Sequence, residues 1–143
     1  MAYNPTATVK ALQSHIAASG EVDDVTIGEP KSPPSAASLV ASIFFRSRLV
    51  VRTTLNGTIE RLVLTVMLYY PMLANPQEEL ELKLALAASN ITEDIIEEYD
   101  LGANVRNIDV GGQEGVALGM VWGYLDIGGK MYRHCDITVP LIV

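Results

Sequence analysis

The stretch from Arg61 to Pro71, RLVLTVMLYYP, constrains the fold of this chain more than any other. It is rich in β-branched, aromatic and leucine side chains, which is typical of a β-strand. Successive side chains of a strand point to opposite faces, and here both faces are largely apolar. Such a strand needs cover on both sides. Any fold of this chain must therefore supply two covers for one strand.

The strand belongs to a long β-hairpin that is expected to turn at Asn56-Gly57. Asn-Gly is typical of two-residue turns, because both central residues need a positive φ. With this turn Leu55 pairs with Thr58, and counting outward places one set of apolar side chains on a common face. We expect that face to be buried, and its members are Phe45, Leu49, Val51, Leu62, Leu64, Val66 and Leu68.

Two segments show helical periodicity. The first, residues 4–20, carries apolar groups at helical spacing, has Thr6 or Thr8 as its expected cap and ends at Gly20. The second, residues 75–100, carries an apolar stripe about 120° wide. We expect this stripe to cover the core face of the hairpin, and it consists of Leu80, Leu84, Ala87, Ala88, Ile91, Ile95 and Tyr99.

The remaining segments complete a sheet. Residues 23–28 are expected to form a short strand, and residues 29–38 a proline-rich connection. Residues 116–127 and 130–143 flank Gly128-Gly129 as a second two-residue hairpin. This order predicts an α+β fold over residues 1–143 as a single domain, with a mostly antiparallel sheet, a long β-hairpin and two helices packed on one face.

The opposite face of the long hairpin is mixed, with arginines between apolar and aromatic groups. In the expected register Arg52 sits opposite Arg61, which is an unfavourable pairing of like charges. Two helices cannot cover both faces of the sheet, so we expect another subunit to cover this one. Two leucines on the outer side of the second helix, one turn apart, would add apolar contact. The residues expected at the subunit interface are Arg46, Arg48, Arg52, Arg61, Val63, Met67, Tyr69, Leu82 and Leu86.

The net charge of −7 is concentrated in one segment. Eight acids and one base lie between Glu78 and Asp100, and the rest of the chain is neutral. The segment from Arg46 to Arg61 has a positive net charge, with four arginines and one glutamate. An acidic chain is a poor candidate for duplex DNA binding, since neutralised phosphates supply most of that affinity. The alternative interpretation of both clusters is solvated surface.

The chain offers few groups for catalysis or metal binding. The run His134-Cys135-Asp136 contains metal-ligand types, but in a strand Cys135 points away from its two neighbours. A nucleophile pair of Cys135 with His15 stays open, although a buried structural cysteine is the commoner case. The segments GGQEG and DIGGK lack the ending of a phosphate-binding loop. We predict no catalytic, cofactor-binding or metal-binding residue.

No window approaches the roughly 18 apolar residues of a membrane helix. The first ten residues, MAYNPTATVK, lack the basic and apolar regions of a secretion signal. A single cysteine, Cys135, fits a reducing compartment. We therefore expect a protein made in the cytoplasm, with no membrane partner.

The chain resembles the tail terminator proteins of long-tailed, non-contractile bacteriophages, especially those that infect actinobacteria. The likeness is carried by the order of several segments and by their coverage, which together span nearly the whole chain. No single segment is a motif with an enforced chemistry. The segments are VTIGEPKSPP, TTLNGTIERLVLTVMLYYPML, YDLGANVRNIDV and VWGYLDIGGKMYRHCDITVPLIV.

The resemblance implies a structural virion protein with no catalytic residues. Such proteins form a six-membered ring that binds the finished tail tube, stops its polymerisation and presents a surface to the head connector. The expected partners are further copies of this chain, the tail tube protein, the head–tail connector or stopper protein and the tape measure protein. DNA would pass through the lumen without specific binding. The expected location is the head-proximal end of the virion tail, after assembly in the host cytoplasm.

Two alternatives stay open. The first is another neck or tail component of a phage, such as the head–tail stopper or a minor tail protein. The second is a small-ligand-binding or enzymatic α+β domain, since one fold can host many functions. Gel filtration separates the last from the others, because a monomer without affinity for a tail tube favours it.

Overall fold

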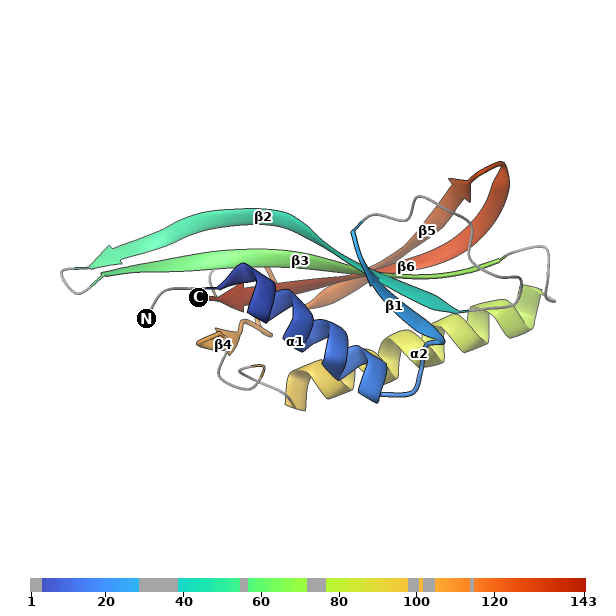
Figure 1. Cartoon of the computed structure of the whole chain (residues 1–143), viewed down its shortest axis with the longest axis horizontal. Helices are drawn as coiled ribbons and strands as arrows, with labels where there is room; N and C mark the ends of the chain where they lie inside the picture. Colours follow the sequence, from blue (N-terminus) through green and yellow to red (C-terminus); the bar gives the residue numbers. More distant parts are fainter. Residues whose placement is uncertain are drawn as a thin grey trace.

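A computed structural model describes residues 4–28, 39–54, 57–71, 77–97, 101, 105–113 and 115–143. Figure 1 shows both helices on one face of a single sheet, and this confirms the expected α+β fold. The elements in chain order are α1 (Pro5–Ala18), β1 (Asp24–Ile27), β2 (Val40–Thr54), β3 (Gly57–Pro71), α2 (Gln77–Glu97), β4 (Asn107–Ile108), β5 (Gly119–Ile127) and β6 (Lys130–Ile142).

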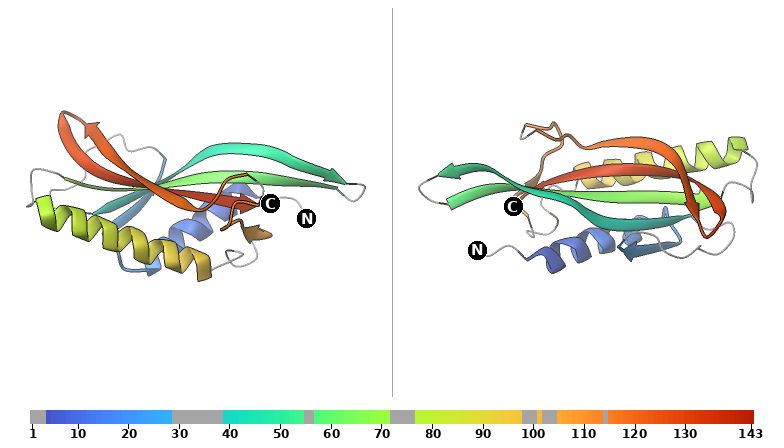
Figure 2. Two further views of the ribbon diagram at one scale, coloured as in Figure 1. Left: turned by 180° about the vertical axis from the view of Figure 1, so that it is seen from behind. Right: turned by 90° about the horizontal axis from the view of Figure 1, so that it is seen from above.

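The strands follow the order β1-β2-β3-β6-β4, with β5 also paired to β6. Only the pairing of β1 with β2 is parallel among the described strands. The β5–β6 hairpin turns at Gly128-Gly129, whose φ values of 59° and 83° are both positive, as the predicted turn requires. Figure 2 shows that this hairpin rises out of the sheet on the side away from the helices. The sheet is therefore curled, not flat.

The main core lies between the helices and the sheet. Val9, Leu12 and Ile16 of α1 are buried in it. The predicted stripe of α2 is buried over its described length, whereas Tyr99 lies outside the described residues. The strands contribute side chains that alternate along β3 and β6, and these are Leu62, Leu64, Val66, Leu68, Cys135, Ile137, Val139 and Leu141.

The helix α1 begins at an asparagine. The Asn4 side chain accepts a hydrogen bond from the backbone N–H of Ala7 at 3.2 Å, and Pro5 occupies the first helical position. Both are favoured at a helix start. The expectation of a threonine cap is therefore wrong: Thr8 is buried, and its hydroxyl donates to the carbonyl of Asn4. Gly20 follows the helix end with a φ of 75°, as expected.

The β2–β3 hairpin turns one residue earlier than predicted. Thr54 pairs with Gly57, so the turn at Asn56-Gly57 is wrong, and the two residues between the pair lie outside the described part. The register then shifts twice, between Phe45 and Ser47 and between Val50 and Arg52. Each shift turns the side chains beyond it to the opposite face of the hairpin, as a β-bulge does. Counting outward from a turn assumes unbroken pairing and cannot reveal such shifts.

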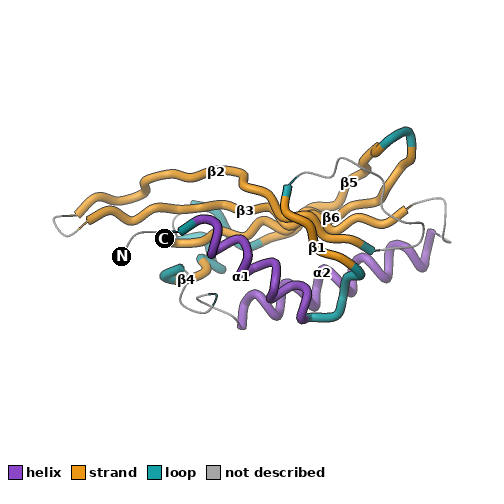
Figure 3. The backbone as a smooth tube through the Cα atoms, viewed as in Figure 1, coloured by secondary structure: helices purple, strands orange, loops and turns teal. Residues whose placement is uncertain are grey.

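These shifts separate the expected core face into two parts. Leu62, Leu64, Val66 and Leu68 are buried as predicted. The prediction is wrong for their partners in the distal half of β2, where Phe45 and Leu49 are 49% and 51% exposed and Val51 is half-buried. Leu49 now pairs with Arg61 on the face away from the helices, and Figure 3 shows that the turn end of the hairpin also extends past α1. No described helix covers that end.

The second face of β3 is covered largely by the chain itself. Val63, Thr65 and Tyr69 are buried, and Met67 is half-buried. A small second core forms where the β5–β6 hairpin curls over this face, and it consists of Val40, Tyr69, Ile127 and Tyr132. The expectation that a second subunit must cover this part of β3 is therefore wrong.

Two tyrosine rings form the centre of the second core. Tyr69 and Tyr132 meet edge to face with their centroids 6.0 Å apart. Burial, together with Tyr69, raises the pKa of the Tyr132 phenol above its usual value. Tyr132 thus stays neutral and acts as a packing residue.

Replacing Tyr132 by alanine tests this second core. Tyr132 is 1% exposed, so we expect Tyr132→Ala to lower the free energy of unfolding by about 3–5 kcal/mol, because it leaves a cavity. The matched control is Tyr124→Ala, since Tyr124 is 57% exposed and should cost less than about 1 kcal/mol. Urea unfolding followed by circular dichroism measures both. Equal losses in the two variants would contradict the assignment of this core.

Candidate assembly interface

Both histidines contact polar groups of the same subunit. His134 Nδ1 lies 2.9 Å from Asp136 Oδ1, on the face of β6 away from the helices. His15 Nε2 lies 3.0 Å from the backbone carbonyl of Asp94, so it connects the two helices. Over the described part of the chain, no three His, Cys, Asp or Glu side chains are grouped so that they could hold a metal ion.

Cys135 faces the main core between its two polar neighbours. Its thiol is fully buried. Burial raises its pKa from 9.0 to about 12, Asp136 adds to the rise, and Arg133 opposes it. A thiol with this pKa is protonated at neutral pH and is a poor nucleophile.

The nine residues expected at a subunit interface do not form one exposed surface in the structure. Val63 and Tyr69 are buried inside the subunit, and Met67 is half-buried against the second core. The side chain of Arg52 lies outside the described residues, and Arg61 is half-buried. The exposed members are Arg46, Arg48, Leu82 and Leu86.

The arginines do not share one face as expected. Arg46 Nε donates to the Thr65 hydroxyl at 3.2 Å, and its guanidinium lies 5.7 Å from the centre of the Phe44 ring. Arg48 pairs with Leu62 on the other face of the hairpin, because the first register shift falls between the two arginines. There Arg48 Nε donates to Glu60 Oε2 at 2.7 Å.

The expected clash of Arg52 with Arg61 does not occur. Arg52 pairs with Ile59 and Arg61 with Leu49. The guanidinium of Arg61 lies against the backbone of Gly115, where a Cβ would come within 2.7 Å of Nη1. The earlier turn of the hairpin thus removes the like-charge pair, because continuous pairing from Thr54 and Gly57 places Arg52 opposite Ile59.

The turn end of the hairpin forms a projection that we call the arm, residues 45–54 and 57–61. Phe45, Leu49 and Val50 are 49%, 51% and 52% exposed on it. At its base an open hollow of about 270 Å³ is lined by Pro5, Phe45, Arg46, Ser47, Arg48 and Leu62. Sequence reasoning missed the arm as a surface, because the alternation of its side chains matches that of a buried strand.

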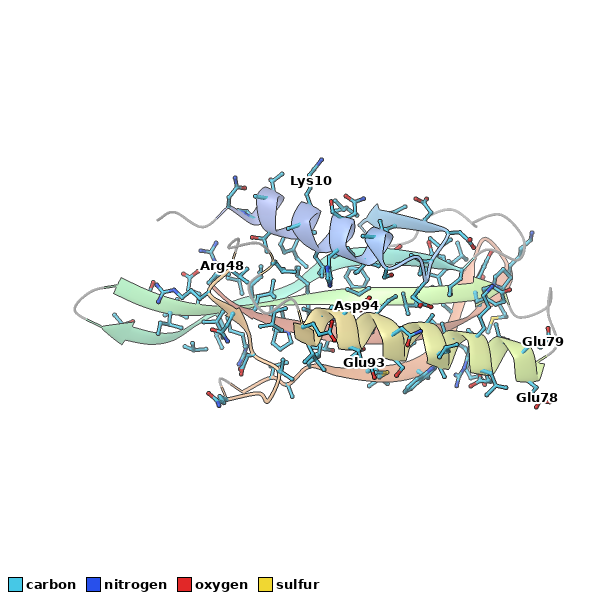
Figure 4. The ribbon with its side chains drawn as sticks, turned by 90° about the horizontal axis from the view of Figure 1, so that it is seen from below. Lys10, Arg48, Glu78, Glu79, Glu93 and Asp94 are labelled. Atoms are coloured by element: carbon cyan, nitrogen blue, oxygen red, sulfur yellow. The ribbon has the colours of Figure 1, made fainter. Side chains whose placement is uncertain are left out.

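A second exposed apolar surface lies on α2 and the β5–β6 hairpin, and we call it the α2–β5 surface. Leu82 and Leu86 are 64% and 61% exposed on the outer side of α2, as predicted. Trp122, Tyr124 and Met131 are 36%, 57% and 42% exposed on the nearby hairpin. Figure 4 shows α2 and this hairpin side by side, seen from below.

An ion pair joins the two parts of the α2–β5 surface. Arg133 Nε lies 2.6 Å from Glu81 Oε1 of α2, and Arg133 Nη1 donates to the carbonyl of Gly123 at 3.2 Å. The same guanidinium lies 4.5 Å from the centre of the Tyr124 ring. A largely buried arginine therefore holds α2, β5 and an exposed aromatic ring in a fixed relation.

The arm and the α2–β5 surface lie at opposite ends of the molecule. Figure 1 places the turn of the β2–β3 hairpin at one end of the long axis, and the start of α2 with the β5–β6 turn at the other. Figure 4 agrees, with Arg48 toward the arm and Glu78 and Glu79 at the far end of α2. The subunit thus has two unlike ends.

No family model matches this chain, and no curated protein is significantly similar to it in sequence. Neither described helix has the length and apolar character needed to cross a membrane.

The environment of Cys135 predicts an unreactive thiol. We expect no reaction of the folded chain with a disulfide reagent at pH 8, because the pKa of about 12 leaves almost no thiolate. Full reaction should follow in denaturant. Since the unfolded thiol ionises near 9, its contribution to the free energy of unfolding is complete below pH 9 and falls as the pH rises toward 12. Rapid labelling of the folded chain would contradict this prediction.

Proposed function

We propose that this chain is a structural virion protein that forms a ring, caps the tail tube of a long-tailed phage and joins the tail to the head connector. The observation that carries the proposal is the arm. It projects from the body with exposed Phe45, Leu49 and Val50, and its turn end extends past α1. Large exposed apolar side chains gathered on one projecting element are typical of an interaction site.

The two unlike ends of the subunit support a ring. A head-to-tail contact between different surfaces forms a ring where its rotation closes and an open filament where it does not, whereas a contact of one surface with itself stops at a dimer. The resemblance to tail terminator proteins supports six members. In this proposal the further partners are the tail tube protein, the head–tail connector or stopper protein and the tape measure protein, while DNA passes through the lumen without specific binding.

The energetics favour apolar contact over charge in holding such a ring. Exposed ion pairs contribute only about 0.2–1 kcal/mol each, whereas buried apolar surface contributes roughly 25 cal/mol per Å². Val63 and Tyr69 have little surface left to contribute, since both are 3% exposed. The apolar contact falls instead to Phe45, Leu49 and Val50 of the arm. Salt should therefore weaken the assembly only mildly.

A tube-capping assay tests the proposal. The tail tube protein encoded in the same phage genome is polymerised with and without this chain. We expect the chain to stop elongation and to appear in electron micrographs as a ring at one end of each tube. Leu49→Asp on the arm should abolish capping, while the control Ile27→Asp, at a β1 position that is 45% exposed, should cap normally.

Tubes that elongate equally in the presence of the chain, with no chain bound, would contradict the tail terminator function. Binding to a connector ring without binding to tubes would favour the head–tail stopper. A monomer that binds neither would favour the ligand-binding or enzymatic alternative.

A further inference from the structure

We infer that the arm of one copy docks on the α2–β5 surface of the next copy, head to tail. This inference rests on the proposed function in one respect only, that the chain assembles with itself. It does not depend on what the assembly caps. The arm and the α2–β5 surface are both exposed on the same molecule. They match each other in apolar character, charge and position.

The arm is built to be held on two sides. Residues paired across a hairpin share a face, so Leu49 shares one face with Arg61, and Val50 shares the other with Glu60. Both Leu49 and Val50 are about half exposed, at 51% and 52%. An arm with apolar groups on both faces fits a partner that contacts more than one side of it.

The α2–β5 surface offers such a contact from two elements. Leu82 and Leu86 come from α2, and Trp122 and Tyr124 come from β5. The Arg133 guanidinium fixes the relation between the two elements through Glu81. The surface is therefore organised before any partner arrives, which lowers the entropic cost of docking.

Charge selects between the possible pairings. The arm region from Arg46 to Arg61 holds four arginines and one glutamate, and the start of α2, at the α2–β5 surface, holds three glutamates (Glu78, Glu79 and Glu81) and one lysine, Lys83. Two arms placed together would repel, and so would two α2 helices. Only the pairing of an arm with an α2–β5 surface brings opposite charges together. Charge thus favours the pairing of unlike surfaces over both self-pairings.

Position makes the contact intermolecular. The two surfaces lie at opposite ends of the long axis, so the arm of one copy cannot reach the α2–β5 surface of the same copy. Every copy then presents one arm and one receiving surface, which is the requirement for a head-to-tail assembly.

Two variants, each with one damaged end, test the inference. The arm variant is Leu49→Asp with Val50→Asp, and the receiving variant is Leu82→Asp with Leu86→Asp. All four positions are more than half exposed, at 51–64%, so both variants should fold, which circular dichroism checks. We expect each variant alone to remain monomeric in sedimentation velocity under conditions where the wild-type chain associates. The control Ile27→Asp should associate like the wild type.

The decisive measurement is a 1:1 mixture of the two variants. The intact arm of the receiving variant can still dock on the intact α2–β5 surface of the arm variant. We therefore expect a heterodimer that grows no further, because its remaining ends are both damaged. A contact of either surface with itself gives no such heterodimer.

Three results would overturn the inference: a mixture that stays monomeric, a variant that associates like the wild type, or a wild-type chain without self-association at the highest concentration tested. Failure of the proposed function is seen separately. If the mixture forms the heterodimer but the wild-type chain does not cap tubes, the docking stands and the tail terminator function fails.

Discussion

The double-sided burial of β3 is the constraint on which the rest of the structure depends. β3 pairs with β2 along one edge and with β6 along the other. Its helix-facing side chains, including Leu64 and Val66, enter the main core, while Tyr69 on the other side packs against Tyr132. A flat sheet with both helices on one side would leave the second side uncovered. The curl of the β5–β6 hairpin removes part of that exposure within a single chain.

The helices and the second hairpin could be predicted from the sequence because their signals are local. Helical spacing placed Leu84 inside and Leu86 outside, and the Gly128-Gly129 pair marked its turn correctly. The register of β2 could not be predicted, because a bulge leaves no mark in the alternation of Phe45 and Leu49. The curl also escaped prediction, since the contact of Tyr69 with Tyr132 joins residues far apart in the chain.

The difference between local and long-range signals also explains which residues of the candidate interface could be predicted from the sequence. The exposure of Leu82 and Leu86 follows from the periodicity of one helix, and it was predicted. The exposure of Phe45 depends on where the helices end relative to the hairpin, which is a tertiary property, and that of Leu49 depends on the register that turns it to the face of Arg61. Apolar residues on a projecting strand look like core residues in sequence. The arm is thus the part of the hairpin that this fold leaves without cover.

With the docking proposed above, a closed ring satisfies the two end surfaces better than any open chain of copies. An open chain of n copies makes one contact fewer than it has arms, and it always leaves one arm with its apolar groups in water. A ring makes as many contacts as it has arms. Every open form leaves Leu49 and Val50 of one arm exposed to water. Because burying these apolar side chains is favourable, ring closure is favoured wherever the docking angle permits it. The twist between the arm and α2 then sets the number of copies in the ring.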